Sequence, residues 1–115
     1  MDVLAQRLFD LFTVHDFDGV EKLMAPGAIV TQNGTSATYA EMRPHLEGLR
    51  AVIGDHRYEN VRRVVGDHAV VEEHDVVSTT PAGKDICLPA CVVVRVNDAG
   101  LIISLDEYVD PTLLM

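Results

Sequence analysis

The strongest constraint on the fold is a change in the spacing of apolar residues near position 56. Before that position they recur every three or four residues, as in amphipathic helices. After it, apolar and polar residues alternate in four segments, 57–65, 68–80, 84–96 and 101–110. Short turns join these segments, so neighbouring strands must pair antiparallel. The sequence therefore predicts helices followed by a four-stranded antiparallel meander.

Two helices and a strand are predicted at the start of the chain. Residues 3–14 have amphipathic spacing and follow Asp2, a good N-cap. A short second helix over 17–24 is expected to end at Pro26-Gly27. Residues 28–32 follow as a short strand.

A third helix is predicted to begin at Thr38, which forms a capping-box pattern with Glu41, and to run to about Ile53. Pro44 lies inside this segment and predicts a bend or a late start. The order of elements indicates an α+β fold, with three N-terminal helices packed on a curved, mainly antiparallel sheet. The length of 115 residues fits a single domain over 1–115.

The charge of the chain bears on its partners. Nine Lys and Arg residues against eighteen Asp and Glu residues give a net charge of −9. This charge repels phosphate backbones and anionic lipids, so neither nucleic acid nor a membrane is an expected partner. The N-terminus lacks the cationic and apolar regions of a signal peptide, and no stretch approaches the ~18 apolar residues of a spanning helix. A cytoplasmic location is therefore expected.

The two cysteines, Cys87 and Cys91, fall on one predicted strand. Four residues of strand separate their α-carbons by roughly 13 Å, too far for a disulfide bond. The chain also lacks CxxC and closely spaced histidine pairs, so neither a metal nor another cofactor is predicted. Buried or interfacial thiols are the expected state of both cysteines.

The segment VVEEHDVVS, residues 70–78, places three carboxylates among valines. If Gly66-Asp67 is a two-residue turn, Val65 lies opposite His68 and directly opposed residues share a face. One face of the hairpin then carries Tyr58, Asn60, Arg62, Glu73 and Asp75, and the other carries Arg63, Glu72 and His74. Apolar residues lie on both faces. One face is therefore expected to pack on the helices and the other on a second copy of the chain, in a homodimer.

A polar cluster on the inner face of a sheet is typical of a pocket. Carboxylates held close together in a low dielectric raise one another's pKa values, as acid–base catalysis requires. Glu73 and Asp75 are therefore predicted to line a pocket, while Glu72 and His74 point to the surface or to an interface. The opposite orientation, with Glu73 and Asp75 in solvent, remains open.

The stretches DFDGVEKLMAPGAIV (16–30) and GLIISLDEYVD (100–110), together with the order of elements, resemble the SnoaL-like, or nuclear transport factor 2-like, superfamily. The resemblance covers nearly the whole chain and implies a cone-shaped α+β barrel that encloses a deep pocket. The superfamily includes isomerases, hydrolases, polyketide cyclases, dehydratases and noncatalytic binding domains. It therefore implies the fold more firmly than the function.

Within this superfamily, the polar residues are most similar to those of limonene epoxide hydrolase. The matching stretches are TQN (31–33), EHD (73–75), PAG (81–83) and LDEYVD (105–110). By this resemblance Glu107 is the base, Asp75 is the acid that protonates the epoxide oxygen, and Asn33 holds the attacking water.

Two positions depart from the epoxide hydrolase pattern. Thr31 stands where that family has a tyrosine, and Glu73 stands where it has the arginine between the two acids. Arg62 is predicted to lie diagonal to Glu73 and to supply the missing charge, and Tyr58 is predicted to lie opposite Asp75 as a donor. A shift of one residue in the turn would remove both contacts.

Two functions remain open. The first is an acid–base enzyme, similar to epoxide hydrolases, isomerases or cyclases, that acts on a small, largely apolar substrate. The second is a noncatalytic ligand-binding or dimerisation module. For both functions, five further residues are expected to line the cavity: Thr31, His45, Leu88, Val92 and Leu105.

Overall fold

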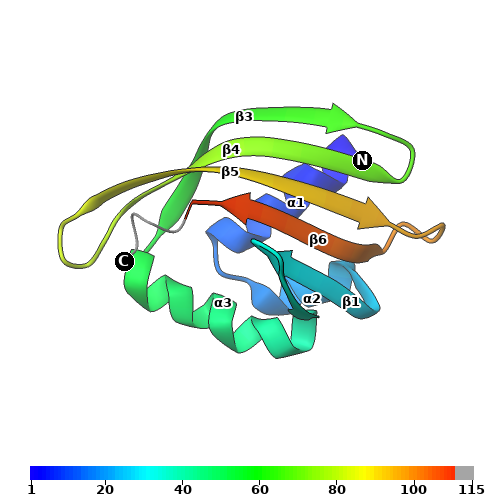
Figure 1. The fold of residues 1–115 in the computed structure, drawn as a ribbon, viewed down its shortest axis with the longest axis horizontal. Coiled ribbons are helices and arrows are strands. Elements are labelled where there is room, and N and C mark those ends of the chain that lie inside the picture. The colour runs from blue at the N-terminus through cyan, green and yellow to red at the C-terminus, as the bar shows by residue number, and fades with distance from the viewer. Residues whose placement is uncertain (111–115) are drawn as a thin grey trace.

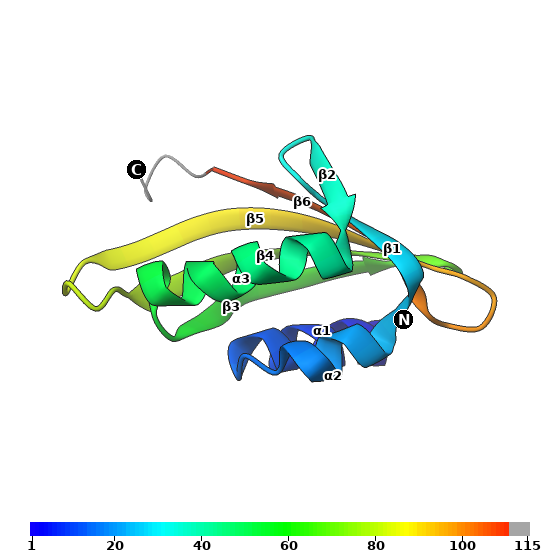
Figure 2. The same ribbon diagram turned by 90° about the horizontal axis from the view of Figure 1, so that it is seen from below.

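The computed structural model describes residues 1–110, in which three helices cover one face of a six-stranded sheet (Figures 1 and 2). The elements in chain order are α1 (Asp2–Thr13), α2 (Phe17–Leu23), β1 (Met24–Gln32), β2 (Thr35–Thr38), α3 (Tyr39–Ile53), β3 (His56–Val65), β4 (Ala69–Thr79), β5 (Asp85–Val96) and β6 (Ile102–Val109). The strand order is β2-β1-β6-β5-β4-β3, so the sheet is open. All its pairings are antiparallel except that of β1 with β6. The predicted α+β class and the meander are confirmed, and the short strand β2 is an addition.

The capping signals predicted the start of α3 but not the ends of the other two helices. Asp2 is the first residue of α1 and not its N-cap, and α2 ends at Leu23, so Pro26-Gly27 lie inside β1. Thr38 caps α3, and its capping box with Glu41 is formed in both directions. Pro44 lies inside α3 without ending it, so the late start did not occur. In α2 the cap is Asp16, whose carboxylate accepts a hydrogen bond from the Gly19 N–H at 2.8 Å.

The core lies between the helices and the inner, concave face of the sheet (Figure 2). The fully buried apolar side chains include Leu8 of α1, Val20 of α2, Val70 of β4 and Ile102 of β6. These residues belong to four elements, so burial of their side chains joins the helices and the sheet through one hydrophobic core.

The hairpin of β3 and β4 differs from its predicted register. Val65 pairs with Val70, and the Gly66 N–H donates to the Ala69 carbonyl at 2.7 Å. The connection is therefore longer than the predicted two-residue turn, and the predicted pairing of Tyr58 with Asp75 is wrong. Tyr58 instead pairs with Val76.

A bulge at Asn60 changes which side chains of β3 face the helices. Asn60 has a φ of 54°, and the pairing with β4 shifts between Glu59 and Arg62. The extra residue reverses the alternation, so even-numbered Tyr58 shares the inner face with odd-numbered Arg63. The bulge thus turns Tyr58 toward the helices.

Replacing Asn60 tests the importance of this backbone conformation. Asn60→Val is expected to be less stable than Asn60→Gly by about 1–2 kcal/mol, because a β-branched residue is strained at positive φ. Both variants lose the hydrogen bond from Asn60 Nδ2 to Asp75 Oδ2 (2.8 Å), so the comparison isolates the backbone. Urea denaturation measures the difference, and equal stability of the two variants would contradict the prediction.

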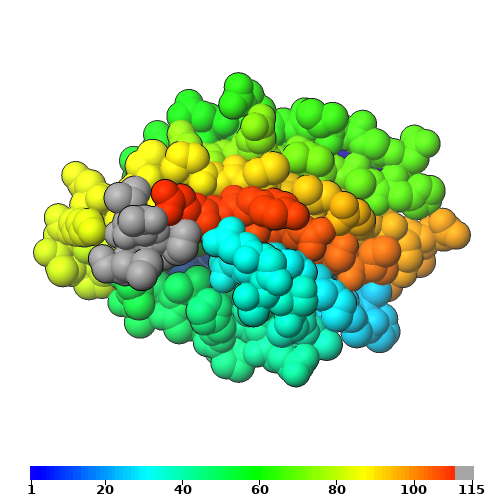
Figure 3. All heavy atoms as spheres, viewed as in Figure 1, coloured from blue at the N-terminus to red at the C-terminus, as the bar shows by residue number. Residues whose placement is uncertain are grey.

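The outer face of the sheet is not covered by helices (Figure 3). It exposes Val64, Ile103 and Tyr108, with exposed fractions of 73%, 42% and 56%. Paired charges, such as Arg95 with Asp106, lie among them. The homodimer expected from the two-faced strands remains a prediction.

Candidate functional site

A cavity of about 160 Å³ lies between the inner face of the sheet, α3 and the C-terminal end of α1. Its walls are mainly apolar and come from all three helices or their ends and from five strands. The apolar lining residues are Phe9, Phe12, Phe17, Val30, Met42, Leu46, Leu49, Ile53, Val76, Leu88, Val92, Leu105 and Val109. This lining suits a small, largely apolar molecule.

Glu107 is the acidic side chain in the cavity lining. The parallel pairing of β1 with β6 sets Gln32 beside it, and Gln32 Nε2 donates to Glu107 Oε1 at 2.6 Å. The amide thus holds one carboxylate oxygen in place. The arrangement presents an oriented carboxylate in an apolar cavity.

A second polar group in the cavity is formed by Tyr58, His56 and His15. The hydroxyl of Tyr58 lies 2.9 Å from His56 Nε2, and the rings of His15 and His56 are 5.6 Å apart between centroids. Two ring nitrogens, His15 Nε2 and His56 Nδ1, are buried without a hydrogen-bond partner among residues 1–110. Asp55 Oδ1 lies 3.4 Å from His15 Nε2, within ion-pair range but without hydrogen-bond geometry.

The surroundings shift the pKa values of two of these side chains in directions that keep both neutral. Burial raises the pKa of Tyr58, and the negative charges of Glu107 and Glu72 raise it further. Burial lowers the pKa of His56 to about 4, and the nearby His15 and His74 add to this effect. At neutral pH the cavity therefore holds a protonated phenol beside a neutral imidazole.

The lowered pKa of His56 predicts a pH dependence of stability. Between pH 6.5 and about 4 the unfolded chain binds a proton at His56 and the folded chain does not, so the folded state loses stability as the pH falls. Compared with His56→Gln, the wild type should lose more stability between pH 7 and pH 4. Urea denaturation at several pH values measures this difference. Parallel curves for the two proteins would contradict the prediction.

A buried ionic group lies behind Tyr58. Glu72 is fully buried, and its carboxylate contacts Arg63 Nε at 2.6 Å and His74 Nδ1 at 2.5 Å. The ring of His74 packs on that of Tyr58, with centroids 4.3 Å apart. Burial lowers the pKa of Arg63, but its hydrogen bonds to Glu72 and Asp2 raise it by more. The group thus supports the wall on which Tyr58 packs.

The predicted orientation of β4 is wrong. Glu72 and His74 face inward and are buried, whereas Glu73 is exposed and Asp75 lies on the outer face, bonded to Asn60. Asp75 therefore does not meet Glu107 in the cavity. The strand alternates as predicted, but burial of the Arg63–Glu72–His74 group selects the opposite face.

Other predicted residues also lie away from the cavity. Asn33 has a φ of 49° and exchanges two hydrogen bonds with the backbone of Val109, at 2.7 and 2.9 Å. Thr31 bonds Ser36 on β2, and His45 is exposed on α3. Arg62 does pair with Glu73, at 3.6 Å, but on the outer face.

The cavity includes five of the predicted site residues: Tyr58, Leu88, Val92, Leu105 and Glu107. Sequence reasoning missed four further polar lining residues, His15, Gln32, Arg50 and His56. Alternation with buried Val30 could have placed Gln32 inside, because residues two apart on a strand share a face. Alternation with Tyr58 could likewise have placed His56 inside, because no bulge lies between these two residues.

Within residues 1–110, no three His, Cys, Asp or Glu side chains are grouped as metal ligands. In the same part of the chain, no helix has the length and apolar character needed to cross a membrane.

The fold and the cavity agree with a match to a protein family. The family model of the SnoaL-like domain matches residues 5–105, so this chain belongs to the SnoaL-like family. Among curated proteins, no sequence match is found.

Solved structures show the same fold at low sequence identity. IdmH from Streptomyces antibioticus, provisionally named a polyketide cyclase, is 17% identical with a TM-score of 0.85; the match covers 98% of this chain and 94% of that chain. A protein of Xanthomonas campestris with the same provisional name is 18% identical with a TM-score of 0.83, covering 97% and 91%. AclR from Streptomyces galilaeus, provisionally a hydroxylase, is 16% identical with a TM-score of 0.84, covering 98% and 83%.

Proposed function

We propose that this protein binds a small, largely apolar carbonyl compound and catalyses proton transfer on it, as in an isomerisation or a cyclisation. The observation that carries this proposal is the pairing of Gln32 Nε2 with Glu107 Oε1 at 2.6 Å inside a mainly apolar cavity. A carboxylate fixed in such surroundings is suited to act as a general base. Two similar structures carry the provisional name of polyketide cyclase, and this name agrees with the proposed chemistry.

The proposed step begins with Glu107 as the base. Its carboxylate removes a proton from the carbon next to the carbonyl, and the electron pair of the broken C–H bond moves to the carbonyl oxygen, giving an enolate. If the substrate has a β,γ double bond, Glu107 then returns the proton to the γ-carbon of the resulting dienolate, which moves the double bond into conjugation with the carbonyl. In a cyclisation, the enolate carbon instead attacks a second carbonyl of the same molecule, and the proton passes to the new alkoxide.

Tyr58 is the proposed donor to the developing enolate oxygen. Its phenol lines the same cavity, and its raised pKa keeps the proton on the oxygen. A positioned donor stabilises negative charge as it forms on the carbonyl oxygen. Epoxide opening by the pattern first expected is less well supported, because Asp75 and Asn33 do not line the cavity.

Exchange of α-hydrogens in 2-tetralone, an apolar bicyclic ketone, tests the proposal. The purified protein is expected to accelerate deuterium incorporation from D₂O into this ketone, as followed by proton NMR. Calorimetric titration with the same ketone measures binding separately. Binding without accelerated exchange would contradict the catalytic proposal and favour the noncatalytic ligand-binding module.

A further inference from the structure

Two buried nitrogen atoms beside the cavity have no hydrogen-bond partner within the part of the chain that the structure describes. His15 Nε2 and His56 Nδ1 belong to rings that both line the cavity, and the His15 side chain is only 6% exposed. An unsatisfied buried polar atom is costly, and such atoms are rare in folded proteins. A polar group of a ligand in the cavity could form hydrogen bonds with both nitrogen atoms.

The surroundings of the two nitrogens indicate which kind of ligand group could bind to both. The carboxylate of Asp55, 3.4 Å from His15 Nε2, favours a proton on that nitrogen, which makes it a donor. His56 is neutral, because its pKa is lowered to about 4, so only one of its two nitrogens carries a proton. A hydroxyl group can accept from His15 and donate to His56 Nδ1 at the same time.

We propose that His15 and His56 form a subsite that binds a hydroxyl group of the ligand, and that this hydroxyl selects the tautomer of His56. This inference rests on the proposed function, and it specifies the ligand as a hydroxylated apolar molecule. A ligand with only a hydrocarbon at this end would leave both nitrogens unsatisfied.

The selected tautomer has a consequence for Tyr58. When His56 Nδ1 accepts from the ligand hydroxyl, the proton lies on Nε2 and is donated to the Tyr58 oxygen 2.9 Å away. The hydroxyl proton of Tyr58 is then free to point toward a second oxygen of the ligand. Without the ligand hydroxyl, the Tyr58 proton can be donated to Nε2 instead. A bound hydroxyl group thus keeps the Tyr58 proton available to the ligand, whereas without it Tyr58 shares that proton with His56 Nε2.

Two probes of similar shape test the subsite: 2-naphthol, and 2-methylnaphthalene, in which a methyl group replaces the hydroxyl. The wild type should bind 2-naphthol about tenfold more tightly, because the hydroxyl gains two hydrogen bonds in a buried site. His15→Leu and His56→Phe should each reduce this preference to about twofold or less while still binding 2-methylnaphthalene. His45→Leu is the matched control, since His45 is exposed outside the cavity.

The tautomer of His56 gives a second measurement, which needs no variant. Long-range proton–nitrogen NMR spectra of the ¹⁵N-histidine-labelled wild type should show a change from the Nδ1–H to the Nε2–H form with 2-naphthol. The change should be absent with 2-methylnaphthalene.

Three results would overturn the subsite: equal affinity for the two probes, an unchanged preference in both variants, or an unchanged tautomer. Failure of 2-naphthol to bind would also overturn it, since the cavity would then not accept the proposed ligand. The proton-transfer proposal is tested independently of the subsite. If 2-tetralone exchange is absent while the hydroxyl preference and tautomer change are present, only the catalytic step is wrong.

Discussion

Arg63→Met is expected to lower the free energy of unfolding by about 3–5 kcal/mol, because it leaves the buried carboxylate of Glu72 without its cationic partner. Glu72 has no exposed surface, and Arg63 Nε lies 2.6 Å from its Oε1. Methionine can fill much of the volume of the arginine stem, so the loss reports charge more than packing. This variant should be among the least stable single substitutions on β3.

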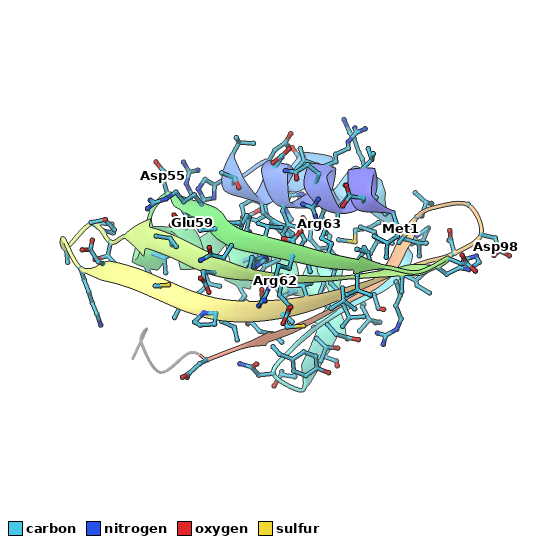
Figure 4. All side chains as sticks on the ribbon, turned by 90° about the horizontal axis from the view of Figure 1, so that it is seen from above. Met1, Asp55, Glu59, Arg62, Arg63 and Asp98 are labelled. Carbon is cyan, nitrogen blue, oxygen red and sulfur yellow. The ribbon has the colours of Figure 1, made fainter. Side chains whose placement is uncertain are left out.

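The position of Arg63 adds a second effect to the loss of charge. Its guanidinium also donates to Asp2 at 3.0 Å and to Gln6 at 2.8 Å, so it links α1 to the sheet. Figure 4 shows Arg63 directed toward this helix, while the neighbouring Arg62 points to the opposite side of β3. Loss of Arg63 should therefore loosen the wall of the cavity formed by α1.

Arg62→Met is the matched control for this prediction. Arg62 makes an ion pair with Glu73 at 3.6 Å on the outer face, and its side chain is 78% exposed. An exposed pair of this kind contributes at most about 1 kcal/mol. Urea denaturation of both variants measures the difference. Similar losses in the two would contradict the structural role assigned to the Arg63–Glu72 pair.

Glu107→Gln is expected to lower the rate of 2-tetralone exchange by about 10²–10⁴-fold, the range typical of a lost general acid or base. Glutamine keeps the size of the side chain but cannot remove a proton. It can still pair with Gln32 through its carbonyl oxygen, so the cavity should retain its shape. Affinity for the ketone, measured by calorimetric titration, should therefore change much less than the rate.

Glu73→Gln is the control for the loss of one carboxylate. Glu73 lies on the outer face of β4 and does not line the cavity. The Glu73→Gln variant should catalyse 2-tetralone exchange at the same rate as the wild type. If Glu107→Gln exchanges as fast as Glu73→Gln, Glu107 is not the base. If both variants lose activity equally, a general effect of charge is responsible.

Much of the fold could be read from periodicity and capping residues, because these signals are local. Thr38 and Glu41 predicted the start of α3, and the alternation after residue 56 predicted the four strands of the meander. Local signals report the conformation of the backbone and which side chains share a face. They do not report which face of a strand is buried.

The hairpin of β3 and β4 illustrates this limit. Alternation correctly separated Glu72 and His74 from Glu73 and Asp75, but both faces contain valine, so polarity did not distinguish inside from outside. The structure buries the face with Glu72, because Arg63 and His74 are present there to satisfy its carboxylate. Partners from different segments decided the orientation.

By itself, the sequence determined the α+β class, the meander and the presence of Glu107 near the end of the last strand. Only the tertiary structure decided that Gln32 pairs with Glu107, because that contact depends on the parallel pairing of β1 with β6. It also decided that Tyr58 lies on the same face of β3 as Arg63, because the bulge at Asn60 shifts the alternation by one residue. Contacts between distant segments and a single irregular residue set the chemistry of the cavity, and neither has a periodic signature in the sequence.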